Sequence, residues 1–112
     1  MKRGEIYWVS LDPIIGSETG KTRPALVIQN DLANRSSPTV TVIPITSRFD
    51  RVYPFQVRIP AGEGGLAREG KALCEQVRTI SRQRLGERIG ELSAQRLREV
   101  REALDRHLWF GL

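Results

Sequence analysis

Short apolar segments separated by polar turns make up residues 1–80. Residues 5–11 are rich in aromatic and β-branched side chains, and their alternation places Ile6 and Trp8 on one face, with Ser10 in line with them. Residues 24–29 form an almost continuous apolar run, which indicates burial on both faces or in a barrel wall. We predict further strands at residues 39–45, 53–59 and 71–80, the last of them bent near Gln76.

In the remaining residues the hydrophobic spacing changes from mainly strand-like to mainly helical. A short helical turn and a strand through Arg88 and Ile89 are expected within residues 82–91. Ser93 is placed to cap a helix that runs to about Trp109, with one apolar face formed by Leu97, Val100, Leu104 and Leu108. Many short strands followed by one helix predict a mainly β fold, a small β-barrel with the helix packed on it.

Length and composition fit one soluble globular domain spanning residues 1–112, with 39% hydrophobic and 28% charged residues. The 18 Lys and Arg residues exceed the 13 Asp and Glu residues, which gives a formal net charge of +5. Most of these cations are arginines, which favour planar contacts with phosphate or carboxylate groups. The charge suits nucleic acid, an acidic protein partner, or neither, because it governs association rather than fold.

The chain has one cysteine, Cys74, so an internal disulfide is excluded and a reducing cytoplasm is favoured. We expect Cys74 to be a buried small apolar residue and His107 to occupy a helix end. One Cys and one His cannot form a transition-metal site of the usual ligand set, so no metal or cofactor is expected. No apolar run approaches membrane-spanning length, and we expect a cytoplasmic protein without membrane contact.

The segment before residues 24–29 carries the most chemistry. Gly16 and Gly20 bracket Glu18, and Pro24 restricts Arg23 to an extended conformation. A carboxylate on a loop beside a fixed guanidinium can grip and react at a phosphodiester. Taken alone, this segment fits a surface loop with incidental charges better than it fits a site.

Several motifs occur together, in order and at matching spacing: KRGEIYW at 2–8, LDP at 11–13, GSE at 16–18, RPALVIQN at 23–30, IPITS at 43–47 and EQVRTI at 75–80. In this combination the chain resembles the MazF/PemK family of toxin endoribonucleases over nearly its whole length. The resemblance implies an SH3-like barrel of the PemK/CcdB kind with a C-terminal helix, assembled as a symmetric homodimer. It also implies a type II toxin that cuts single-stranded mRNA at a short sequence without metal, leaving 2′,3′-cyclic phosphate and 5′-OH ends. The implied partner is a cognate antitoxin whose acidic, disordered tail blocks the RNA groove.

The resemblance assigns Arg23 and Thr46 as the catalytic arginine and threonine. A permanently charged guanidinium suits stabilisation of the transition state, and the Thr46 hydroxyl can hydrogen-bond a non-bridging phosphate oxygen. Glu18 is our candidate general base, although it can equally pair with Lys21. Without the family, Thr46 would be a simple strand-end hydroxyl.

A second group of residues is expected to bind RNA: Lys21, Asn30, Ser47, Arg48, Gln76 and Arg78. Gln76 and Arg78 are predicted to share one face of a strand, from which they can reach bases or phosphates. Asn30 could equally serve to stabilise a turn at the strand end. Cations in loops, including Arg51, are by default interpreted as solvated surface residues.

Aromatic residues are expected mainly in the core or in an interface. Trp8 is assigned to the core, and Tyr53 and Phe55 alternate with Gln56 in a predicted half-buried strand. Trp109 and Phe110 are expected to pack on the barrel or in a dimer.

Two other functions stay open from the sequence. One is an SH3-like module that binds acidic peptides or nucleic acid without chemistry, and the other is a barrel toxin that poisons a topoisomerase by protein contact. Glu18, Arg23 and Thr46 together favour the nuclease over both.

Overall fold

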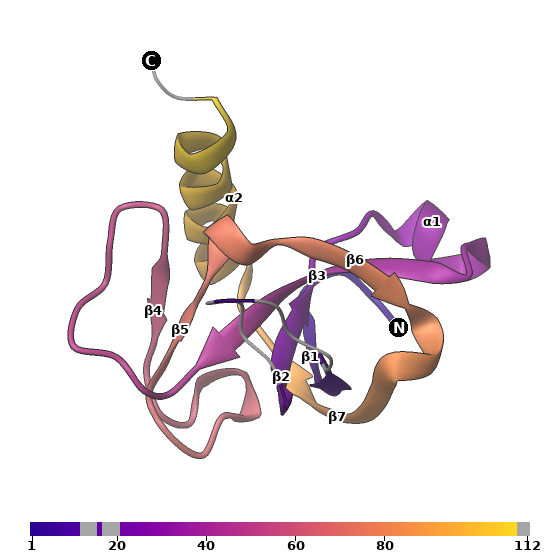
Figure 1. Ribbon diagram of the computed structural model, residues 1–112, viewed down its shortest axis with the longest axis horizontal. Helices are drawn as coiled ribbons and strands as arrows, with labels where there is room; N and C mark the ends of the chain where they lie inside the picture. The colour runs from indigo at the N-terminus through magenta and orange to yellow at the C-terminus, as the bar shows by residue number, and fades with distance from the viewer. Residues whose placement is uncertain (12–15, 17–20, 110–112) are drawn as a thin grey trace.

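The computed structural model describes residues 1–11, 16 and 21–109. The strands are β1 (Glu5–Ser10), β2 (Thr22–Val27), β3 (Thr39–Thr46), β4 (Val57–Ile59), β5 (Gly70–Ala72), β6 (Arg78–Ser81) and β7 (Leu85–Glu91). The helices are α1 (Asp31–Ser36) and α2 (Ala94–Leu108), and three short 3₁₀ turns are η1 (Glu63–Gly65), η2 (Cys74–Gln76) and η3 (Arg82–Arg84). The predicted fold class, mainly β with a C-terminal helix, is confirmed (Figure 1).

The strands form one antiparallel sheet in the order β4-β5-β3-β2-β1-β7, and β6 also pairs with β3. β3 is the hub of this sheet. Its first half pairs with β6, its end pairs with β5, and its other edge pairs with β2. Elements that are far apart in sequence therefore meet along β3.

The sheet buries apolar side chains on both faces, and the run in β2 shows how. Leu26 packs in one core cluster, whereas Ala25 and Val27 pack in a second cluster. All three are fully buried. Val100 and Ala103 of α2 close the first cluster. The prediction that this strand is buried on both faces is thus confirmed.

The cap of α2 is also as predicted. Ser93 is the N-cap, and its hydroxyl accepts a hydrogen bond from the Arg96 amide at 3.1 Å. The far end of the helix differs from expectation, because Leu108 is 60% exposed and Trp109 is 78% exposed. Packing of Trp109 on its own barrel is therefore wrong, and packing in a dimer stays a prediction. Phe110 lies outside the described residues.

The strand predicted at 53–59 is shorter than expected. Only Val57–Ile59 is extended, because the Gln56 amide donates to the carbonyl of Tyr53 and closes a turn. This turn inverts the expected faces: Gln56 is buried, whereas Tyr53 is 43% exposed and Phe55 is half-buried. A core position for Tyr53 is therefore wrong.

Two further differences concern short elements. The strand predicted at 71–80 is split into β5 and β6 by the turn η2, so the bend near Gln76 is larger than expected. The polar segment after β2 contains α1, whose N-cap is Asn30. None of the helices in the described part of the chain is long and apolar enough to cross a membrane.

Candidate active site

Arg23 and Thr46 are carried by neighbouring antiparallel strands. In the β2–β3 pair, Ala25 lies opposite Pro44. Arg23 precedes Ala25 by two residues and Thr46 follows Pro44 by two, so alternation puts both side chains on the same face at the same end of the pair. Arg23 is half-buried and Thr46 is buried. The structure thus brings the two predicted catalytic residues together.

The Thr46 hydroxyl is oriented by the chain that follows it. Its Oγ1 accepts a hydrogen bond from the Arg48 amide at 3.2 Å, which closes a tight turn at the end of β3. A hydroxyl that accepts from an amide still has its own hydrogen to donate. Thr46 is therefore arranged as a donor, and the turn places Ser47 and Arg48 on the surface beside it.

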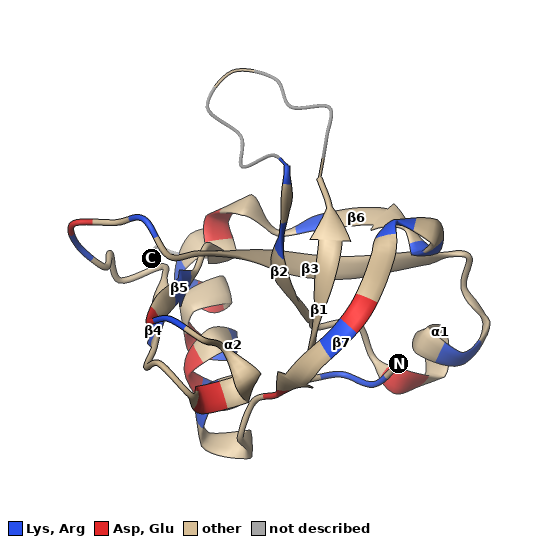
Figure 2. Cartoon of the chain, turned by 90° about the horizontal axis from the view of Figure 1, so that it is seen from below, with Lys and Arg blue, Asp and Glu red and all other residues tan. Residues whose placement is uncertain are grey.

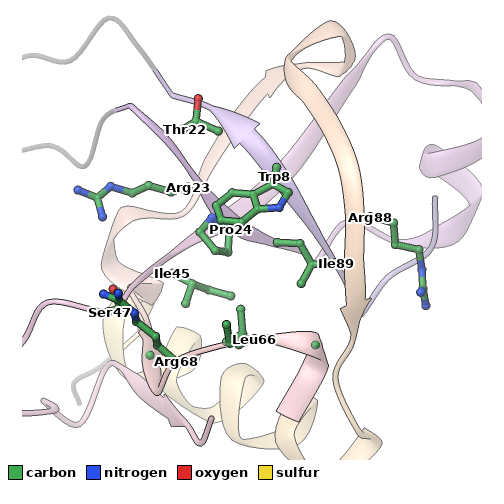
Figure 3. A pocket seen from close by; sticks show the side chains of 13 residues that line it. Trp8, Thr22, Arg23, Pro24, Ile45, Ser47, Leu66, Arg68, Arg88 and Ile89 are labelled. Atoms are coloured by element: carbon green, nitrogen blue, oxygen red, sulfur yellow. The ribbon is translucent and has the colours of Figure 1, made fainter. Parts of the chain in front are cut away.

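Arg23 also stands at the rim of a pocket of about 460 Å³. Apolar side chains line much of this pocket: Trp8, Pro24, Ile45, Leu66 and Ile89. Polar side chains, including Arg23, Ser47 and Arg68, also border it, and Figure 3 shows Arg23 extending away from the apolar lining. A pocket of this kind can take a planar apolar group whose charged substituent reaches the guanidinium.

Trp8 belongs to this pocket rather than to the core, so our assignment of Trp8 to the core is wrong. Its side chain is 44% exposed and lies in the pocket wall. Trp8 keeps the face of Ile6, as alternation predicts, and lies opposite Pro24 in the regular β1–β2 pair. Beside Trp8 and Pro24 this face opens into the pocket instead of continuing as closed core, and the sequence pattern carries no sign of that opening.

The far wall of the pocket is held by the turn η1. Gly65 has a φ of +80°, and a Cβ at this position would overlap the carbonyl of Ile89. Glu63 accepts two hydrogen bonds from the Arg96 guanidinium, at 2.6 Å and 3.1 Å. Close backbone contact with β7 and an ion pair with α2 therefore place Leu66 in the pocket wall.

Arg78 lies on the other edge of β3. It pairs with Val42, four residues before Thr46 and therefore about 13 Å along the strand. Arg78 is half-buried and shares its face of β6 with Ile80. Gln76 lies in η2 rather than in a strand, so the argument that alternation aligns Gln76 with Arg78 is wrong. Figure 2 shows basic residues at the start of β2, on β5 and on β6.

The other candidates lie in different places. Lys21 is exposed directly before β2 with a φ of 62°, and its carbonyl accepts from the Leu11 amide at 2.8 Å. The Asn30 side chain caps α1 by accepting from the Ala33 amide at 2.9 Å. The far end of β2 is about 13 Å from Arg23, and Asn30 lies beyond it. The turn chemistry that we left open for Asn30 is confirmed, and the fold does not bring it to the site.

Glu18 lies outside the described residues. Its role as base and its pairing with Lys21 both stay predictions.

The lone cysteine is a buried small residue, as expected. Cys74 is fully buried in η2, and burial, reinforced by the nearby Glu75 carboxylate, raises the pKa of its thiol to about 12. No cluster of three or more His, Cys, Asp or Glu side chains suited to a metal ion occurs among residues 1–11, 16 and 21–109.

Sequence reasoning passed over the buried charge of Lys71. Lys71 on β5 is only 8% exposed, and it lies opposite Thr46 in the β3–β5 pair. A lysine inside the apolar stretch GKALC was the signal for it.

Known proteins are similar to this chain in sequence and in fold. Residues 2–108 match the family described as PemK-like, MazF-like toxin of type II toxin-antitoxin system. The endoribonuclease MazF9 of Mycobacterium tuberculosis is 46% identical, with 96% of each chain covered. The crystal structure of MazF from Deinococcus radiodurans superposes with a TM-score of 0.84 at 34% identity, covering 96% of each chain. A MazE–MazF structure from the same organism has a TM-score of 0.78 at 33% identity, covering 99% of this chain and 97% of the other.

The match spans β1 to α2, including the strands that carry Arg23, Thr46 and Arg78. This chain therefore belongs to the PemK/MazF family of type II toxin–antitoxin toxins.

Proposed function

We propose that this chain is an endoribonuclease that cuts single-stranded mRNA at a short sequence, as the toxin of a type II toxin–antitoxin pair. One observation carries the proposal: Arg23 and Thr46 share one face at the same end of the β2–β3 pair, and Arg23 also borders an apolar pocket. Membership of a family whose curated relatives are endoribonucleases supports it. We assign residues 1–112 to one toxin domain that acts in the cytoplasm.

The reaction needs no metal, because RNA carries its own nucleophile. The 2′-oxygen loses its proton to a base, for which Glu18 is the candidate, and bonds to phosphorus as the bond to the 5′-oxygen breaks. A proton passes to that oxygen, which leaves 2′,3′-cyclic phosphate and 5′-OH ends. Arg23 stabilises the charge that builds on the phosphoryl oxygens, and the Thr46 hydroxyl donates to one of them.

The substrate is single-stranded because a free base can leave the stack and its backbone can rotate for in-line attack. The exposed ring of Trp8 offers such a base a stacking surface in the pocket. Ser47, Arg48 and Arg78 extend the contact surface away from Arg23, and Lys21 and Gln76 complete it. These contacts position the RNA, whereas Arg23 and Thr46 lower the barrier.

The functional form is a homodimer, and its partner is a cognate antitoxin with an acidic, disordered tail. The exposed Leu108 and Trp109 at the end of α2 supply apolar surface for a second copy. An acidic tail would meet the same arginines as an RNA backbone. The similarity to a MazE–MazF assembly supports this pairing.

The test is cleavage of a defined single-stranded RNA in excess EDTA, with analysis of both new ends. We expect cuts at one short sequence, with cyclic phosphate and 5′-OH termini. Binding without cleavage would favour the non-catalytic module. Inhibition of a topoisomerase without any RNA cleavage would favour the second alternative.

A further inference from the structure

Lys71 is a buried cation that the proposed reaction does not use. Its ammonium group donates hydrogen bonds of 2.8 Å to the carbonyl of Arg51 and 2.8 Å to Oε1 of Gln56. The rings of Phe49 and Tyr53 lie 5.4 Å and 5.6 Å from the ammonium nitrogen. Burying a charge is unfavourable unless it gains such contacts. All four come from residues 49–56, the segment between β3 and β4 (Figure 1).

The position of Lys71 links this segment to the candidate site. Lys71 lies directly opposite Thr46 in the β3–β5 pair. The segment that Lys71 holds begins just after Thr46, and its first residues are Ser47 and Arg48. The Arg48 amide bonds the Thr46 hydroxyl at 3.2 Å. Movement of residues 49–56 would therefore reach the hydroxyl through only a few residues of backbone.

Gln56 connects the Lys71 contact to Tyr53 and Glu75. Its Oε1 also accepts from the Tyr53 amide at 3.1 Å, and its Nε2 donates to Oε2 of Glu75 at 2.8 Å. Lysine can only donate and a carboxylate can only accept, so Lys71 and Glu75 together dictate which way the Gln56 amide points. The other oxygen of Glu75, Oε1, is buried without a hydrogen-bond partner in the described part of the chain.

Glu75 belongs to η2, the turn that also contains Gln76 and leads into Arg78 on β6. Three side chains, Lys71, Gln56 and Glu75, thus connect the end of β3 with the turn before β6. We name them the Lys71 relay.

We propose that Lys71 is a positioning residue for RNA cleavage, which holds residues 47–56 against the Thr46 strand end and joins them through Gln56 and Glu75 to the Gln76–Arg78 contact surface. This inference rests on the proposed endoribonuclease function. Lys71 touches no reacting atom, because its ammonium group is occupied by Arg51, Gln56 and the two rings. Its effect is on the distance and angle between the phosphate-binding groups and the surface that holds the flanking nucleotides.

The first experiment compares Lys71→Met with Lys2→Met. Both remove one positive charge from a lysine, but Lys2 is exposed and lies next to the N-terminus, on the opposite side of the molecule from β4 in Figures 1 and 2. The readouts are the single-turnover cleavage rate at saturating RNA and the Kd for an RNA with a 2′-deoxy substitution at the cleaved position. We expect Lys71→Met to lower the rate at least about tenfold, since small misplacement of catalytic groups is costly in rate, and to change the Kd less than about threefold. Lys2→Met should leave the rate unchanged. Equal rates for Lys71→Met and wild type would overturn the inference.

A second set of variants avoids removing the buried charge. Gln56→Glu keeps an oxygen for Lys71 and for the Tyr53 amide but sets two carboxylates against each other at Glu75. Combining it with Glu75→Gln restores a donor–acceptor pair. We expect Gln56→Glu to lower the saturating rate and the double variant to recover most of it. Two additive losses would contradict the relay.

Hydrogen exchange separates this inference from the proposed function, because it needs no RNA. In Lys71→Met the Tyr53 amide should exchange at least about tenfold faster, while the amides of α2 are unchanged. Unchanged exchange at Tyr53 would show that Lys71 does not hold the segment. A wild-type protein that fails to cut RNA in EDTA would instead overturn the proposed function, whatever the exchange result.

Discussion

Ala25 on β2 lies directly opposite Pro44 on β3, and this pair decides where the proposed catalytic side chains stand. Counting two residues from each partner brings Arg23 and Thr46 to the same face and the same end of the strands. Neither residue is near the other in sequence. Their proximity is a consequence of strand register, so the proposed site depends on the β2–β3 pair staying in register.

Arg23→Ala should lower RNA cleavage by on the order of a hundredfold or more, because it removes a charge that stabilises the transition state. Arg23→Lys should fail as well, because an ammonium group cannot reproduce the planar fork of a guanidinium. Single-turnover kinetics on a defined RNA measures both variants. Arg35→Ala, an exposed arginine on α1, is the matched control. A folded Arg23→Ala protein with near-wild-type turnover would show that Arg23 is not catalytic.

Arg78→Ala should weaken RNA binding and leave cleavage with the same end chemistry. Arg78 lies about 13 Å along β3 from Thr46, so it meets a flanking phosphate rather than the cleaved one. In a plot of log K against the logarithm of the salt concentration, the slope should become shallower by about one unit. The reason is that one fewer phosphate contact releases correspondingly fewer counterions. Binding measured between low and physiological salt gives this slope. Unchanged affinity with a collapsed cleavage rate would instead make Arg78 a catalytic residue.

Gly65→Ala should destabilise the fold by about 3 kcal/mol or more, because φ is +80° and the new Cβ overlaps the backbone of Ile89. Gly62→Ala is the control, since Gly62 has a φ of +88° but open space around it. It should cost only about 1 kcal/mol. Urea unfolding measures both. Similar losses would mean that η1 is not pressed against β7 as described.

Because of Glu5, the free energy of unfolding should fall in acid. Burial by itself raises the pKa of Glu5, but hydrogen bonds from Arg88, the Lys2 amide and Tyr7 outweigh burial, so its pKa lies below the ordinary value of 4.5. A depressed folded-state pKa contributes stability that is complete above about pH 4.5 and lost as pH falls through the folded-state value. Wild type should therefore exceed Glu5→Gln in urea midpoint at pH 7, and the difference should shrink below pH 4.5. A difference independent of pH would contradict this account.

The chain should form a homodimer at micromolar concentration. Leu108 and Trp109 are strongly exposed apolar side chains at the end of α2, and such surface is normally covered in solution. Sedimentation equilibrium of wild type and Trp109→Ser measures the dissociation constant, which should rise in the variant. Only monomer in wild type would contradict the prediction.

Local sequence patterns were enough to predict the elements in which buried and exposed positions repeat regularly. The apolar run at residues 24–29 indicated burial on both faces or in a barrel wall, and Ala25–Val27 at its centre are fully buried. Ser93 marked the start of α2, because a helix cap is recognisable from neighbouring residues. The family motifs likewise pointed to Arg23 and Thr46 before any geometry was known.

Other features depend on residues that meet only after folding. Trp8 faces a pocket because Leu66 and Ile89, from distant segments, form its other walls, and Gln56 is buried because Lys71 and Glu75 bond both ends of its amide. A pocket wall and a buried polar contact each need distant partners, which periodicity cannot supply. Side-chain identity along the chain therefore indicated what chemistry was available. Strand register and long-range hydrogen bonds decided which of these side chains stand together.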